Sequence, residues 1–272
     1  MNNAKKSIVL IILTPIFFIL SLWVSVFPHE YAHAVAAWIF GYKLGPFDIS
    51  YGKFNWQNVL FVDGIDEHVN YFLIYLFGDK FAMGMIAFAG PFIATLLLYF
   101  LSLYLMRLNS IKNRPYLFYF IFWVNVSNLS ELISYAALRS ISRHGDIGHI
   151  EFAWGISQWF IFVVGCVLLS VAAWHFFSRT IVELYLRTRV DSMPMKCFFL
   201  ILFSFLLFAY SGARVLLENN GLFSMSLSIL FCIITPIIII ICWPKREWVK
   251  EREGIYMTYP GENALKIGTL DC

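Results

Sequence analysis

The hydrophobic residues of this chain gather in six runs, each long enough to cross a lipid bilayer as a helix. A hydrocarbon core about 30 Å thick needs roughly 20 apolar helical residues, and a helix satisfies its own backbone hydrogen bonds in lipid. The runs cover residues 7–40, 81–106, 116–138, 152–177, 197–217 and 222–243. This pattern predicts an all-α polytopic membrane protein with about six transmembrane helices.

The longest stretch between two runs, residues 41–80, predicts a small β-like segment beside the membrane. Glycines punctuate it, and residues 47–51 and 59–62 have the apolar, β-branched character of short strands. Residues 71–77 predict an interfacial helix. Further along, residues 178–196 are polar and predict a helix lying along the inner membrane face.

Composition strengthens the membrane interpretation. The chain has 272 residues, of which 60% are hydrophobic and 14% charged, and a soluble domain could not hide so much apolar surface. The first run is also far too long for the core of a signal peptide. The net charge of +3 is small, and the basic residues are scattered over short loops. This distribution argues against a nucleic-acid partner. We expect a multi-pass protein of the cell membrane, surrounded by the lipid bilayer.

The distribution of Lys and Arg predicts the orientation. If the spans alternate, 14 of the 20 basic residues fall on the side of the N-terminus and 6 on the other. Basic residues favour the cytoplasmic side. The N-terminus and the charged residues 244–272 are therefore expected in the cytoplasm, and the end of the first run on the outer side.

The end of the first run carries the motif His29-Glu30-Tyr31-Ala32-His33. On a helix, positions i and i+4 lie on one face, so His29 and His33 can share one metal ion. Imidazole nitrogens are good zinc ligands. The carboxyl of Glu30 can then serve as the base that takes a proton from the attacking water. This is the zinc metalloprotease arrangement.

A catalytic zinc needs a third protein ligand and an open position. The first run ends on the same side as the loop after the third run, which contains His144, Asp146 and His149. Asp146 is the preferred third ligand. His149, His144 and Glu131, an acidic residue within the third run, are the alternatives.

Asn125, Asn128 and Glu131 recur every three residues and form a polar stripe on the third run. Such a stripe faces the protein interior rather than lipid. Two roles remain open for it: hydrogen bonds between helices, or binding of a substrate backbone by Asn125 and Asn128.

These features together resemble the site-2 protease family of intramembrane zinc metalloproteases. The resemblance covers roughly residues 15–150 and rests on residues 29–34 and the glycine-containing β-like segment after them. It also rests on the sequence Ala89-Gly90-Pro91 in the second run, and on Asn125 and Asn128 followed by Asp146 beside a glycine. It implies that Asp146 is the third zinc ligand. The chain departs from the family in the longer spacing of that Asn and Asp, and in an active site that the charge distribution places on the outer side.

The expected organisation has three parts. Residues 1–150 would form a catalytic membrane core of three helices, residues 151–243 three further helices, and residues 244–272 a charged cytoplasmic tail. The expected function is hydrolysis of peptide bonds in membrane-embedded protein substrates, with the segment after Gly41 adding the unwound substrate as a strand. The alternative is a non-proteolytic, metal-binding interaction or regulatory protein of the same fold. Glu30 favours the enzyme, since a structural metal needs no adjacent base.

Overall fold

The protein is a bundle of long apolar helices. The structure is a computed structural model that describes residues 3–62, 64–142, 145–213 and 222–258. Five helices in it are long and apolar enough to cross a membrane: Lys6–Ile39, Lys80–Arg107, Pro115–Arg139, Gln158–Arg187 and Met193–Ala213. The described residues contain no β-strand. These findings confirm the all-α fold and agree with a multi-pass membrane protein.

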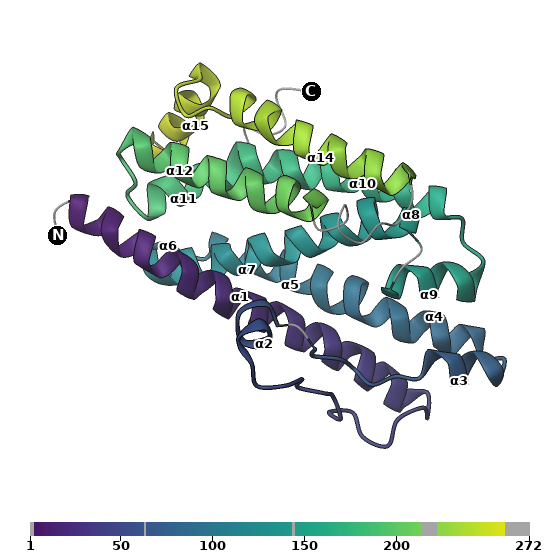
Figure 1. Ribbon diagram of the computed structural model, residues 1–272. Helices are drawn as coiled ribbons and strands as arrows, with labels where there is room; N and C mark the ends of the chain where they lie inside the picture. Colours follow the sequence, from purple (N-terminus) through teal and green to yellow (C-terminus); the bar gives the residue numbers. More distant parts are fainter. Residues whose placement is uncertain (1–2, 63, 143–144, 214–221, 259–272) are drawn as a thin grey trace.

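The first span is one unbroken helix, α1 (Asn3–Ile39), although Pro15 and Pro28 lie inside it. The second span consists of α4 (Lys80–Phe88), η1 (Ala89–Thr95) and α5 (Leu96–Arg107). The middle part, η1, has the wider turns of a π-helix. Figure 1 shows α1 beside this second span, with α7 (Pro115–Ile133) next to both.

The third span continues from α7 through η2 (Ser134–Arg139), another π-helical stretch, into α8 (Ser140–Ser142). After it comes a short separate helix, α9 (Gly145–Trp154). Gly155 ends α9 with a φ of 66°, a conformation that glycine adopts without strain. The next span therefore starts at Gln158 rather than at residue 152.

The fourth span is longer than predicted. It comprises α10 (Gln158–His175), η3 (Phe176–Thr180) and α11 (Ile181–Arg187). Residues 178–196 were predicted to form a helix along the inner membrane face. Residues 178–187 are helical but continue the fourth span, and Ile181, Val182 and Leu184 are buried in the core of the bundle. Polar residues between the apolar ones made this buried face hard to recognise in the sequence.

The fifth span contains α12 (Met193–Ser204) and η4 (Phe205–Tyr210), and the apolar helix α14 (Leu222–Ile241) follows it. The described apolar part of α14, Met225–Ile241, is shorter than a full span. Part of the predicted tail is helical, α15 (Glu247–Thr258). Rings from α7, η3 and α12 interlock in the largest apolar cluster, namely Phe118, Phe122, Trp123, Phe176, Phe199 and Phe203.

The β-like segment was predicted wrongly. Residues 59–62 lie in and just after a helix, α2 (Trp56–Phe61), whose first turn is capped because Asn55 Oδ1 accepts a hydrogen bond from the Asn58 amide at 2.8 Å. Residues 47–51 form no strand either, and one isolated bridge joins Ser50 to Asp66. The predicted helix at 71–77 is confirmed as α3 (Tyr71–Leu76), with α6 (Asn109–Lys112) as a further short turn.

Candidate metal centre

Two histidines of α1 and one aspartate of α9 direct their ligand atoms toward one point. His29 Nε2 and His33 Nε2 are 3.1 Å apart. Asp146 Oδ2 lies 3.3 Å from His29 Nε2, and Asp146 Oδ1 lies 3.4 Å from His33 Nε2. We call these three side chains the metal-binding trio, because together they can hold a metal ion. The helical i, i+4 spacing places the two histidines as the sequence predicted.

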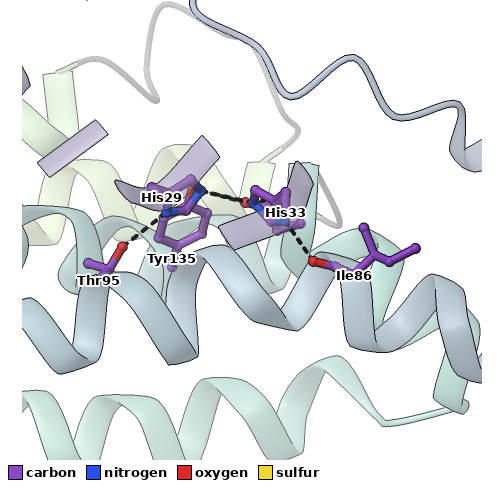
Figure 2. Close-up of polar contacts among 6 residues, drawn as sticks. His29, His33, Ile86, Thr95 and Tyr135 are labelled. Atoms are coloured by element: carbon purple, nitrogen blue, oxygen red, sulfur yellow. Dashed lines mark hydrogen bonds and ion pairs between the residues drawn. The ribbon is translucent and has the colours of Figure 1, made fainter. Parts of the chain in front are cut away.

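The second span holds the histidine rings in this orientation. His33 Nδ1 donates a hydrogen bond to the Ile86 carbonyl at 2.7 Å, and His29 Nδ1 is 3.0 Å from Thr95 Oγ1 (Figure 2). A neutral His33 therefore has its lone pair on Nε2, facing His29. A hydrogen-bond partner on the second ring nitrogen fixes both the tautomer and the ring direction of a histidine that binds a metal.

The trio is largely shielded from solvent. His33 is 1% exposed and His29 7% exposed, while the Asp146 side chain is 14% exposed. Burial alone would raise the pKa of Asp146, but the adjacent His33 and His29 hold that pKa well below its usual range. The carboxylate, rather than the acid, is the form of Asp146 that would bind a metal.

Gly90 of η1 lies directly against the two histidines. A Cβ built on Gly90 would overlap His33 Nε2 and would come within 2.6 Å of His29 Nε2. The second span can therefore pass this close to the ligand atoms only because residue 90 has no side chain. The Ala89-Gly90-Pro91 sequence noted above is thus part of the site.

Replacing Gly90 by Ala is expected to lower metal affinity by about 10-fold or more, because the new methyl group displaces the histidine nitrogens from each other. Metal content after dialysis against a graded chelator series measures this. Gly84→Ala is unsuitable as a control, because its Cβ would overlap Trp154, whereas Gly45 has open space around it. Gly45→Ala should bind metal as the wild type does, and equal affinity in Gly90→Ala would contradict the role of Gly90.

Tyr135 of η2 is a residue of this site that the sequence analysis missed. Its ring stacks on His29 with centroids 5.6 Å apart, and its hydroxyl is 3.2 Å from His29 Nε2. Arg139 also lies over this ring, with its guanidinium carbon 4.5 Å from the ring centroid. Figure 2 shows Tyr135 beside His29. Tyr135 is four residues after Glu131, so continuing the polar stripe of the third span by one turn would have found it.

A cavity of about 630 Å³ opens beside the trio. It lies among α1, the third span, η4 of the fifth span and the segment around α2, and its border includes His29, Glu30, Glu131 and Tyr135. Its volume falls within the range of about 300–1,000 Å³ that is usual for ligand pockets. The cavity extends along α1 as far as Phe18, deep in the apolar part of that helix.

Glu30 borders this cavity and also faces the loop after the first span. Its carboxyl lies next to that of Glu67, and both are close to the trio. Tyr71, which lies outside the spans, is affected by the same carboxyl groups. Burial raises the pKa of its hydroxyl most, and the nearby Glu67 and Asp146 raise that pKa further. Glu67 was not singled out in the sequence, because it belongs to no periodic pattern.

The other candidates lie elsewhere. Among the alternative third ligands, His149 stacks on Tyr71 at 4.1 Å between centroids, Glu131 borders the cavity, and neither belongs to the trio. His144 lies outside the described residues. The structure thus brings Asp146, and not His149 or Glu131, to the two histidines.

Asn125 and Asn128 are fully buried and do not border the cavity. Asn125 Nδ2 donates to Ser102 Oγ at 2.9 Å, and Asn128 Nδ2 donates to Ser25 Oγ at 3.0 Å. These bonds join the third span to the second and first spans. Of the two roles left open for the stripe, the structure places both asparagines in contacts between helices, and their part in substrate binding stays a prediction.

Comparison with protein-family models, characterised proteins and solved structures finds no match to this chain. The interpretation of the site therefore rests on its own residues. They form a buried group of two imidazoles and one carboxylate that can hold a metal ion, with a second carboxyl and a cavity beside it.

Proposed function

We propose that the chain is an intramembrane zinc metalloprotease in which His29, His33 and Asp146 hold zinc and Glu30 is the general base. The observation that carries this proposal is the approach of His29 Nε2, His33 Nε2 and the Asp146 carboxylate to within 3.1–3.4 Å of one another. Two imidazole nitrogens at that distance in a buried site need a proton or a cation between them, because their lone pairs repel.

The spacing of the trio suits zinc. A tetrahedral zinc with bonds of about 2.0–2.1 Å has its ligand atoms about 3.3–3.4 Å apart. The two nitrogens are 3.1 Å apart, and each lies 3.3–3.4 Å from a different oxygen of Asp146, which is close to that figure. With one oxygen of Asp146 counted, the three ligand atoms lie within 4.8 Å of one another. Two nitrogens and one oxygen are also a ligand set typical of catalytic zinc, which takes three protein ligands and leaves one position open.

Glu30 supplies the acid–base chemistry. Zinc, when bound, would polarise the scissile carbonyl and activate a water molecule. The Glu30 carboxylate accepts the proton of the attacking water and then donates it to the nitrogen of the leaving amine. Its position on the helix, directly after His29 and on the border of the cavity, suits this transfer.

The cavity supports a substrate that comes from the membrane. It lies among several of the spans and is lined by Glu30, Glu131 and Arg139 toward the metal centre and by Phe18 and Leu22 further along α1. A substrate helix has to unwind before cleavage, because its peptide carbonyls are otherwise hydrogen-bonded. Polar groups in the cavity can bind the freed backbone. Addition of the substrate as a strand to residues 47–51 or 59–62 is not retained, because those residues form no strand.

The alternative, a purely structural metal, is less well supported. A structural zinc is closed by four protein ligands, whereas the described residues bring three to this point. A purely structural metal would need neither the neighbouring cavity nor the carboxyl of Glu30. A non-proteolytic regulatory protein would be expected to lack one or both.

The proposal is tested by purifying the full chain in detergent, measuring bound zinc, and incubating it with a panel of membrane-peptide helices in lipid vesicles. We expect about one zinc per chain and at least one peptide cut within its apolar segment. Removing the metal with a chelator should abolish cleavage, and added zinc should restore it. Bound zinc with no cleavage across a diverse panel would favour the regulatory alternative, and a wild type that binds no zinc would overturn both.

A further inference from the structure

A second polar pocket lies at the opposite end of the bundle from the metal centre. Its volume is about 380 Å³, and four basic side chains line it: Lys6, Lys112, Arg187 and Arg189. They come from the first turns of α1, from α6, and from the end of α11 and the turn that follows it, and these elements gather at one end of the bundle in Figure 1. We call this the basic pocket.

Positive charge exceeds negative charge around the basic pocket. Glu183 pairs with two of the four cations, at 3.6 Å from Lys112 Nζ and 3.4 Å from Arg187 Nε. Asp191, two residues after Arg189, adds at most one more carboxylate. The partial negative charge at the end of α11 amounts to roughly half an elementary charge. Among the residues that the structure describes, a net positive charge therefore remains.

Burial makes this imbalance costly. The side chains of Lys112 and Arg187 are 17% and 19% exposed, so water stabilises them only in part. A cation that is mostly buried and shares its one carboxylate with another cation is poorly compensated. An anion bound in the pocket would balance this excess positive charge. Arginine guanidinium groups bind phosphate oxygens especially well, because they offer several N–H donors in a fixed plane.

The position of the pocket indicates which anion. Lys6 begins one membrane span, Pro115 begins another and Arg187 ends a third, and all three residues line the pocket. The ends of spans lie at the level of the lipid headgroups. Tyr116, another lining residue, is 41% exposed, as expected of a tyrosine at the membrane interface. Basic pockets between transmembrane helices suit phosphate-bearing headgroups.

We propose that the basic pocket binds the phosphate headgroup of an anionic membrane lipid. Lys6 and Arg189 contact the phosphate, while Lys112 and Arg187, held by Glu183, supply the surrounding positive potential. The site is independent of the metal centre, and its occupation ties the start of α1 to α6 and α11.

The test uses the full chain in detergent and native mass spectrometry, with phosphatidylglycerol and phosphatidylcholine as probes. We expect the wild type to retain phosphatidylglycerol at least 10-fold more tightly. A double variant, Lys6→Gln with Arg189→Gln, should lose roughly 10-fold or more of that affinity. It leaves the ion pairs of Glu183 in place. The matched control is Lys53→Gln with Lys250→Gln, which removes two exposed charges that do not line the pocket and should bind as the wild type does.

Equal retention of the two lipids, or a double variant that binds as tightly as the wild type, would overturn the proposal. A third arm adds inorganic phosphate at millimolar concentration. We expect it to leave the bound lipid in place. If phosphate alone displaces the lipid, the natural ligand is a soluble phosphate, and the assignment to a membrane lipid is wrong.

Discussion

Glu30→Gln is expected to reduce peptide cleavage roughly 1,000-fold or more while leaving about one zinc per chain, because general acid–base catalysis contributes about 10²- to 10⁴-fold. Glutamine has nearly the same shape as glutamate but cannot accept the proton of the attacking water. Glu30 is not part of the metal-binding trio, so the metal should stay. The measurement is single-turnover cleavage of a peptide found in the vesicle screen, together with zinc content.

Glu131→Gln is the matched control for this change. Glu131 also borders the cavity, so the substitution removes an equal charge from the same space, but it lies on the third span rather than beside His29. We expect an effect of a few-fold at most. If both variants lose activity equally, the charge of the cavity matters and Glu30 is not the base. A Glu30→Gln protein that still cuts at the wild-type rate would exclude the proposed mechanism.

The parts of the site that could be predicted are those set by local helix geometry. His29 and His33 face the same way because they are four residues apart on a helix, and no distant contact is needed to place them. Five of the six predicted spans likewise follow from the length of the apolar runs. Asp146 was favoured among several candidates by topology and by resemblance, and the structure brings it to the histidines.

The parts that could not be predicted depend on contacts between distant segments. Nothing in the sequence says that Gly90 lies against two histidines 57 and 61 positions earlier, since that depends on how α1 crosses the second span. The strand predicted at 59–62 failed for a local reason. Its β-branched residues suited a strand, but Asn55 caps a helix at that place, and capping outweighed a weak preference.

The role of a polar residue in a membrane helix is also difficult to predict from the sequence. The stripe of Asn125, Asn128 and Glu131 was recognised as facing the interior, and the two asparagines are indeed buried. The sequence cannot distinguish a side chain that joins two helices from one that borders a cavity, because both face away from lipid. Within this stripe, Asn128 donates a hydrogen bond to Ser25 of another helix, whereas Glu131 lines the cavity.

Asp146→Ala is expected to lower zinc affinity more than about 100-fold, because second-shell changes alone typically cost 10- to 100-fold and this change removes a ligand. It also leaves two imidazole nitrogens 3.1 Å apart without the carboxylate that faces them both. The His29–His33 pair would then bind metal weakly, and cleavage would fall with occupancy. Elemental analysis after dialysis against a chelator series provides the affinity.

The matched control for Asp146→Ala is His149→Ala, which changes another candidate ligand on α9, three residues further along. His149 stacks on Tyr71 and is outside the trio, so its loss should leave zinc affinity within a few-fold of the wild type. The two variants disturb the same short helix, and a difference between them therefore reports on the ligand rather than on the stability of α9. If His149→Ala loses zinc and Asp146→Ala retains it, the third ligand is the histidine, and α9 must shift by about 4.5 Å along its axis, the rise of three residues, when the metal is bound.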